Sequence, residues 1–283
     1  GMIACVEYGI MNIVAEAIES AAIAAAPARA SDMREPYRAR TMPPMAEIVM
    51  TEPGAFGRHA LVVGDPDRAE LLAAELLQDV ERTSDHRGLP GFAGTYDGKR
   101  VGIQAHGVGG ASAVLVFEEL IRAGAERIVR LGTFGSLSPA FQPGDLLCAA
   151  AAIPHDGASR ALVHGEPHAP LADFEIVHAA VHDAKHLGVR MRVGLVATTD
   201  LYYDPDDDLD RRWAARGAVG VDMETATLLT LAPLRGISAG SFLVCSNVVD
   251  APATQWTADE HRAAFLTAAP VALSALLSEP KPK

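Results

Sequence analysis

Short apolar runs alternate with longer amphipathic segments along most of the chain. Runs typical of buried strands occupy 60–63, 128–131, 145–153, 193–199, 219–221 and 238–246. Apolar residues at helical spacing predict helices at 67–77, 111–123, 171–187, 223–234 and 257–277. Two further strands, 92–96 and 100–105, flank Asp97-Gly98, which is typical of a hairpin turn. The segments 132–141, which contains glycine, and 202–210, which is acidic, are expected to be loops.

This order of elements predicts the fold class. The strands are apolar and alternate with helices, so we expect an α/β fold whose parallel or mixed sheet is covered by helices on both faces. The first part of the chain differs, because a helix-like pattern at 10–24 is followed by a Pro/Arg-rich stretch from residue 27. We therefore divide the chain into an N-terminal arm, 1–44, and a main domain, 45–283.

Composition and charge narrow the classes of function. The 283 residues are 49% hydrophobic and 21% charged, which excludes wholesale disorder. A net charge of −12 disfavours binding to a nucleic-acid backbone. No apolar run is long enough to predict a membrane span. The cysteines Cys5, Cys148 and Cys245 are distant from one another, which favours reduced thiols in a cytoplasmic protein.

Candidate ligand-binding residues follow the predicted strands. In such sheets, ligands bind beyond the carboxyl ends of the strands. Gly64 favours a tight turn, and Arg68 supplies a cation one helical turn further on. Arg130 shortly precedes Gly132 and Thr133. This combination favours a phosphate site, because guanidinium groups, exposed backbone N–H groups and a hydroxyl can all donate hydrogen bonds to phosphate oxygens.

Two carboxylates mark a second type of chemistry. Asp222 and Glu224 flank Met223 at the end of a predicted strand. A carboxylate can bind two sugar hydroxyls while the methionine packs under the ring. The alternative is that these acidic residues only stabilise the N-terminus of the helix that follows.

Three patterns resemble other kinds of site. His178, His182 and His186 share one face of a predicted helix at metal-binding spacing, but we interpret them as a solvated face. The Asp-rich stretch 204–210 lacks the glycine and the glutamate of a calcium loop. Gly107-x-Gly109 is an incomplete dinucleotide fingerprint. We predict no metal and no organic cofactor.

The ordered motifs resemble those of the nucleoside phosphorylase family that contains hexameric bacterial purine nucleoside phosphorylases and uridine phosphorylases. The matching stretches are GDPDR (64–68), HRGLPGFAGTYDGKRV (86–101), AHGVGGAS (105–112), ERIVRLGTFGSL (126–137), TTDLYYDPD (198–206) and VGVDMETATLL (219–229). The resemblance implies a three-layer α/β/α sandwich around a mixed, partly barrel-like sheet. It also implies cleavage of a nucleoside by inorganic phosphate, giving free base and ribose 1-phosphate.

The resemblance also implies residue roles. Its phosphate-binding positions correspond to Gly64, Arg68, Arg130 and Thr133, with Arg87 reaching the site of a neighbouring subunit. A dimer is then the minimal active unit, and the family suggests a hexamer.

The sugar and base positions follow in the same way. Met223, Glu224 and Asp222 correspond to ribose-binding positions, Asp222 standing where glutamate is usual. Tyr202, Val221, Ser246 and Asn247 correspond to positions around the base. Arg130, Glu224 and Asn247 are the candidate catalytic residues.

The chain departs from the family at the base. Purine-cleaving members usually have Ser-Asp where this chain has Ser246-Asn247. An amide can donate a hydrogen bond but not a proton, so 6-oxopurine nucleosides are favoured over adenosine. Asp250 is an alternative acid if its loop rearranges.

Two other family features are missing. The Gln-x-Arg pair with which uridine phosphorylases bind uracil is absent from 204–208, which disfavours uridine unless Gln255, His261 or Arg262 enters the pocket. His59 is too close to the first strand to bind the 5′-hydroxyl. A hydrolytic nucleosidase and a binding protein without turnover stay open as alternatives.

Overall fold

The computed structural model describes residues 48–249 and 256–278. The arm predicted for 1–44, with its helix at 10–24, lies outside the described residues, as do Asp250 and Gln255. The boundary near residue 45 therefore stays a prediction.

Nine strands of the described chain form one mixed sheet, in the order β2-β3-β4-β1-β5-β8-β7-β6-β9. Their bounds are β1 His59–Val63, β2 Gln78–Ser84, β3 Gly91–Tyr96, β4 Lys99–Ala105, β5 Arg127–Ser136, β6 Leu146–His155, β7 Met191–Thr199, β8 Ala218–Asp222 and β9 Ser238–Val248. The β3–β4 hairpin turns at Asp97-Gly98, as the sequence predicted.

The sheet closes on itself in one half. β5 pairs with β1, β8 and β9, so β5, β8, β7, β6 and β9 form a closed five-strand barrel. The β5–β9 pairing is parallel and shifts register after Phe134, and the last two residues of β5, Gly135 and Ser136, pair with both β9 and β8. This confirms the mixed, partly barrel-like sheet that the resemblance implied.

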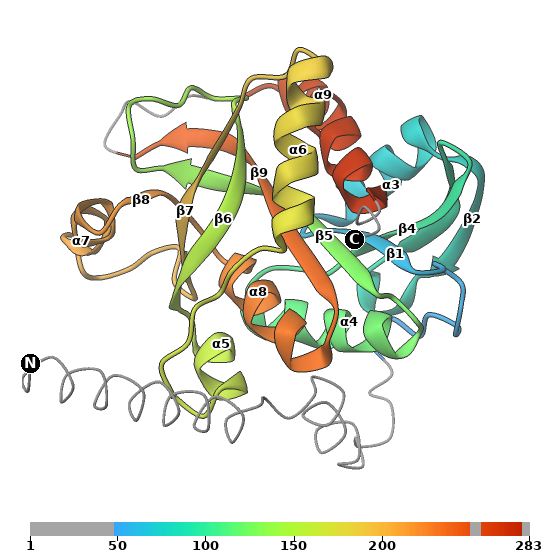
Figure 1. Cartoon of the computed structure of the whole chain (residues 1–283), viewed down its shortest axis with the longest axis horizontal. Coiled ribbons are helices and arrows are strands. Elements are labelled where there is room, and N and C mark those ends of the chain that lie inside the picture. Colours follow the sequence, from blue (N-terminus) through green and yellow to red (C-terminus); the bar gives the residue numbers. More distant parts are fainter. Residues whose placement is uncertain (1–47, 250–255, 279–283) are drawn as a thin grey trace, which may run out of the picture. The chain divides into compact units, whose positions relative to one another are not determined.

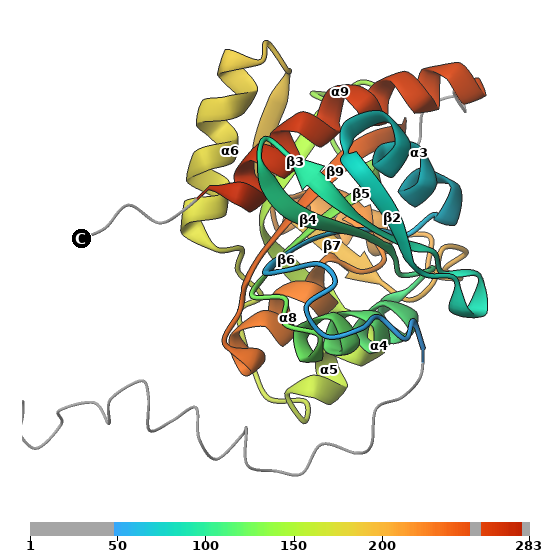
Figure 2. The same ribbon diagram turned by 90° about the vertical axis from the view of Figure 1, so that its right-hand side faces the viewer.

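Helices cover both faces of the sheet (Figures 1 and 2). One apolar core joins the strands to α3, α6 and α9, and a second core joins them to α4 and α8. The bounds of the described helices are α3 Pro66–Leu76, α4 Gly110–Arg122, α5 Gly157–Leu162, α6 Phe174–His186, α7 Leu209–Ala215, α8 Thr225–Arg235 and α9 Ala258–Leu277. This is the predicted three-layer arrangement, and none of the described helices is long and apolar enough to cross a membrane.

The predicted elements differ from the observed ones in four places. β2, α5 and α7 were not predicted, and β5 continues to Ser136 through the expected loop 132–141. β2 is exposed along most of its length and therefore lacks an apolar period. A Cβ at Gly132 would overlap the guanidinium of Arg130. That clash shows that the arginine side chain lies over the strand.

Candidate active site

A cavity of about 970 Å³ opens beyond the carboxyl ends of several strands. All the sequence-predicted site residues except Arg87 line it; they are Gly64, Arg68, Arg130, Thr133, Tyr202, Val221, Asp222, Met223, Glu224, Ser246 and Asn247. The fold therefore brings the candidate phosphate, sugar and base positions together in one space.

Arg130 lies at the closed end of this cavity. Its side chain is 4% exposed, and its Nη1 lies 3.1 Å from Oδ2 of Asp222 while Nη2 donates to Oε2 of Glu224. Nε and Nη1 have no well-aligned hydrogen-bond acceptor among the described residues. Since a guanidinium carries five N–H donors, Arg130 has more donors than its two ion pairs use.

Asp222 is held from several directions. Oδ1 accepts from the hydroxyl of Thr198 at 2.6 Å, and Oδ2 accepts from the hydroxyl and the backbone N–H of Thr225 at 2.6 and 3.0 Å. With the Arg130 ion pair added, few acceptor directions are left for a ligand. This geometry favours a role in orienting Arg130 over the expected contact with ribose.

Glu224 retains more acceptor capacity. Oε1 accepts from the backbone N–H of Gly109 at 2.6 Å, and Oε2 accepts from Arg130. Gly109 has a φ of +85°, a conformation that favours glycine. Burial, and secondarily the Asp222 carboxylate, raise the pKa of Glu224 against the opposing effect of Arg130. The carboxylate keeps further lone pairs for the hydroxyls of a ligand.

Arg68 adds a second cation from the first turn of α3. Its guanidinium carbon lies 3.7 Å from the centre of the Phe265 ring, and its Nη2 lies 3.8 Å from Asp65. Burial, and secondarily the neighbouring Arg130, lower the pKa of Arg68 to about 10. The side chain therefore stays charged at neutral pH, which gives this end of the cavity two cations.

His106 lies behind this end of the cavity and is fully buried. Its ring packs edge-on against Phe117, with 5.4 Å between the ring centres, and neither nitrogen forms a well-aligned hydrogen bond. Burial, and then the charge of Arg130, hold the pKa of His106 well below its usual range. The imidazole is therefore neutral and adds no charge to the site.

Asn247 faces the opposite end of the cavity from β9. The Ser246 hydroxyl lies 2.9 Å from Oδ1 of Asn247 and 3.1 Å from the carbonyl oxygen of Phe134, and its single proton can be donated to either. When Oδ1 accepts this proton, the amide N–H₂ of Asn247 is left as a donor to a ligand.

Residues of the acidic segment form the mouth of the cavity. Tyr202 lies there and is 75% exposed. α7 contributes Leu209, Arg211 and Trp213, which the sequence analysis missed. Leu209 and Trp213 are buried one helical turn apart, a spacing that signals this helix.

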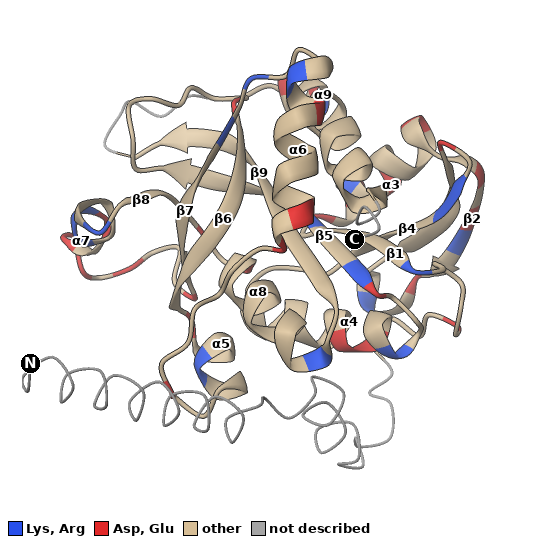
Figure 3. Ribbon diagram, viewed as in Figure 1, with Lys and Arg blue, Asp and Glu red and all other residues tan. Residues whose placement is uncertain are grey.

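The mouth is charged but internally paired. Asp208 forms an ion pair with Arg211 at 2.8 Å, and Asp206 pairs with Arg212. Figure 3 shows both charge signs gathered on α7 and the segment before it. The carboxylates of Asp206 and Asp208 therefore already have cationic partners.

Several candidates lie outside this cavity. Arg87 has a φ of +57° in a single 3₁₀ turn, His86–Gly88, and does not line this cavity. His59, His261 and Arg262 do not line it either, so the alternative that His261 or Arg262 contacts a base finds no support in this structure. Within 48–249 and 256–278, no group of three or more His, Cys, Asp or Glu residues is arranged to hold a metal ion.

Comparison with known proteins identifies the family. A profile of the phosphorylase superfamily matches residues 58–278, and the chain belongs to this superfamily. A "Purine nucleoside phosphorylase DeoD-type" of Caldanaerobacter subterraneus subsp. tengcongensis is 36% identical over 222 residues, covering 78% of this chain and 95% of that protein. A protein with the same description from Exiguobacterium sp. AT1b is 33% identical, covering 78% and 93% respectively.

Proposed function

We propose that this protein cleaves the N-glycosidic bond of a purine nucleoside with inorganic phosphate, giving the free base and a pentose 1-phosphate. 6-Oxopurine nucleosides are the favoured substrates. The observation that carries the proposal is the closed end of the cavity, where Arg68, Arg130 and Glu224 meet. The similarity to purine nucleoside phosphorylases supports the same class of substrate.

The two arginines hold the phosphate. The guanidinium groups of Arg130 and Arg68 bind its oxygens, together with the backbone at Gly64 and the hydroxyl of Thr133. Bound phosphate then stabilises the positive charge that develops on the sugar and attacks its anomeric carbon.

Glu224 orients the sugar. Its carboxylate is fixed by Gly109 and Arg130, so its remaining lone pairs are directed before the substrate arrives. Met223 packs against the ring, and Asp222 positions Arg130. As the C–N bond breaks, its electron pair leaves with the base.

Asn247 stabilises the leaving base. Its amide donates a hydrogen bond to N7 or O6 of a 6-oxopurine, on which the negative charge is delocalised. Adenosine has no O6 and gains more from a proton donor, which an amide cannot replace. Val221, Ser246 and Tyr202 complete the surroundings of the base.

The family resemblance further suggests that Arg87 enters the site of a neighbouring subunit, within a dimer or a hexamer. This role accounts for an arginine that does not line the cavity of its own subunit.

The experiment is a substrate panel with and without phosphate. Inosine, guanosine, adenosine, uridine and thymidine are incubated with the protein, and free base is quantified by chromatography. We expect phosphate-dependent release of hypoxanthine and guanine, with adenosine poor. Equal release without phosphate would identify a hydrolytic nucleosidase. Inosine binding without any release would identify a binding protein, and release from uridine alone would contradict our assignment of the base site.

A further inference from the structure

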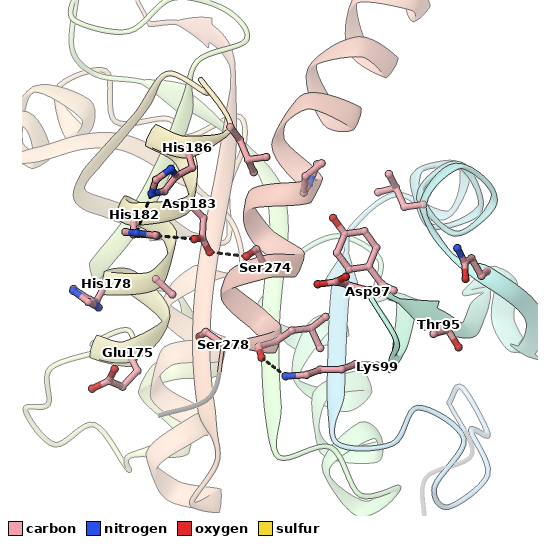
Figure 4. A pocket seen from close by; sticks show the side chains of 17 residues that line it. Thr95, Asp97, Lys99, Glu175, His178, His182, Asp183, His186, Ser274 and Ser278 are labelled. Carbon is pink, nitrogen blue, oxygen red and sulfur yellow. Dashed lines mark hydrogen bonds and ion pairs between the residues drawn. The ribbon is translucent and has the colours of Figure 1, made fainter. Parts of the chain in front are cut away.

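A second hollow of about 1000 Å³ lies between α6, α9 and the β3–β4 hairpin (Figure 4). It shares no lining residue with the proposed nucleoside cavity. α6 presents His178, His182 and His186 to it, at successive turns of the helix. The sequence favours a solvated helix face for these histidines. In the structure, two of them also lie in direct contact with each other.

Two of the three imidazoles face each other. Nε2 of His182 lies 3.0 Å from Nε2 of His186, and the ring centres are 4.2 Å apart. His178 instead stacks on Phe174, with 5.8 Å between the ring centres. The pair His182–His186 is thus distinct from the third histidine.

A carboxylate fixes the orientation of one ring. Nδ1 of His182 lies 3.0 Å from Oδ1 of Asp183, and Oδ2 of Asp183 accepts from the hydroxyl of Ser274 on α9 at 2.6 Å. When Nδ1–H donates to Asp183, the lone pair of His182 is on Nε2, facing His186. Such a carboxylate–histidine contact is the usual support of a metal-binding imidazole.

We propose that His182 and His186 bind one divalent late transition-metal ion, with Asp183 orienting His182 and water completing the coordination. Metal–nitrogen bonds are about 2.0–2.1 Å long, so two nitrogens 3.0 Å apart subtend about 94° at a bridging ion. That angle matches adjacent positions of a square-planar or octahedral ion.

The donor set decides which ions fit. Neutral imidazole suits Cu(II), Ni(II) and Zn(II), whereas Mg²⁺ and Ca²⁺ prefer oxygen ligands. The order of divalent affinities places Cu(II) first. We therefore expect affinity to decrease from Cu(II) to Ni(II) and Zn(II), with no measurable binding of Mg²⁺ at this site.

The test uses the full-length, untagged protein after treatment with a chelator. Cu(II) is titrated and followed by calorimetry, and electron paramagnetic resonance reports nitrogen ligation. We expect one ion per chain with two nitrogen ligands. His182→Ala and His186→Ala should each weaken binding at least about tenfold, and Asp183→Asn should weaken it about tenfold. His178→Ala, one turn away on the same helix, is the matched control and should bind like the wild type.

Two results would overturn the proposal. One is a titration unchanged by the double substitution H182A/H186A, which would place the ion elsewhere and leave the 3.0 Å contact as a hydrogen bond between the two rings. The other is an equal loss in His178→Ala, which would exclude the two-histidine geometry. Thermal unfolding without metal checks that each variant is folded, and phosphorolysis should be unchanged in all of them.

Discussion

The two ends of the proposed nucleoside cavity are built differently. At the closed end, Arg130, Asp222 and Glu224 are buried and bonded to one another, to backbone N–H groups and to threonine hydroxyls. At the mouth, Tyr202 is exposed, and Arg211 and Arg212 of α7 form ion pairs at the surface with Asp208 and Asp206 of the preceding segment.

This difference suggests that the two ends have different functions. A buried and prebonded group changes little when a ligand arrives, so the closed end is suited to stabilising a developing charge. An exposed segment can change without loss of the core, so the mouth is suited to selecting among bases.

Glu224→Gln should have the largest effect. The substitution keeps the shape but removes the charge that orients the sugar and pairs with Arg130. We expect kcat/KM for inosine to fall by roughly 10²–10³-fold, the magnitude of one lost preorganised contact. Steady-state kinetics measures this, with Glu175→Gln on α6 as a control that should leave it unchanged. A loss below about fivefold would show that the closed end does not control catalysis.

Asp222→Asn distinguishes a positioning residue from a ribose ligand. If Asp222 orients Arg130, the variant should raise KM for phosphate by about tenfold or more while KM for inosine changes less. The free energy of unfolding should fall by about 3 kcal/mol, because a buried ion pair loses one partner. Kinetics with each substrate varied in turn, together with denaturant unfolding, gives both values. A rise confined to KM for inosine would instead place Asp222 on the sugar.

Asn247→Asp tests the base end. The carboxyl group that it introduces can carry a proton, so we expect the ratio of adenosine to inosine phosphorolysis to rise by about 10²-fold, the lower end of the range for general-acid assistance. The ratio of kcat/KM values measures it, and Asn247→Ala, which supplies no acid, should lower both activities. An unchanged ratio would show that another residue contacts the purine ring at N7.

The sequence predicted the closed end better than the mouth. Arg68, Arg130 and Glu224 follow strong strand and helix signals, and strand ends of an α/β sheet converge, so their meeting was predictable. The same reasoning cannot place Asp222 in its hydrogen-bond network, because Thr198 and Thr225 come from different elements. Only the three-dimensional register of β7 and β8 brings them together.

At the mouth, α7 was not predicted, for a local reason. The segment before α7 has four aspartates within 204–208, and that composition is typical of a loop. The helix forms nevertheless, because Leu209 and Trp213 pack against Ala197 and Ala218 of the barrel. Barrel closure likewise depends on Gly135 and Ser136 of β5 pairing with both β8 and β9, which no periodicity in the sequence reveals.

His106, behind the closed end, should make the free energy of unfolding depend on pH. Its pKa in the folded protein lies well below the unfolded value near 6.5, so below that pH the unfolded chain takes up the proton first. Stability should therefore be lost as the pH falls below about 6.5, by about 1 kcal/mol at pH 5.5. Unfolding free energies at pH 8.0 and 5.5 measure this, and His106→Leu should lose less over the same interval. Equal losses in both proteins would mean that His106 is not held neutral.

Arg211→Ala should have the smallest effect. Arg211 lines the mouth, but its side chain is 74% exposed and pairs with Asp208 at the surface. We expect kcat/KM for inosine to change by less than about threefold, because exposed ion pairs contribute little. Kinetics with inosine and uridine measures this, and Arg216→Ala, which follows the same helix but does not line the cavity, is the matched control. A loss above tenfold for either nucleoside in Arg211→Ala alone would show that α7 contacts the base directly, and the mouth would then share in catalysis with the closed end.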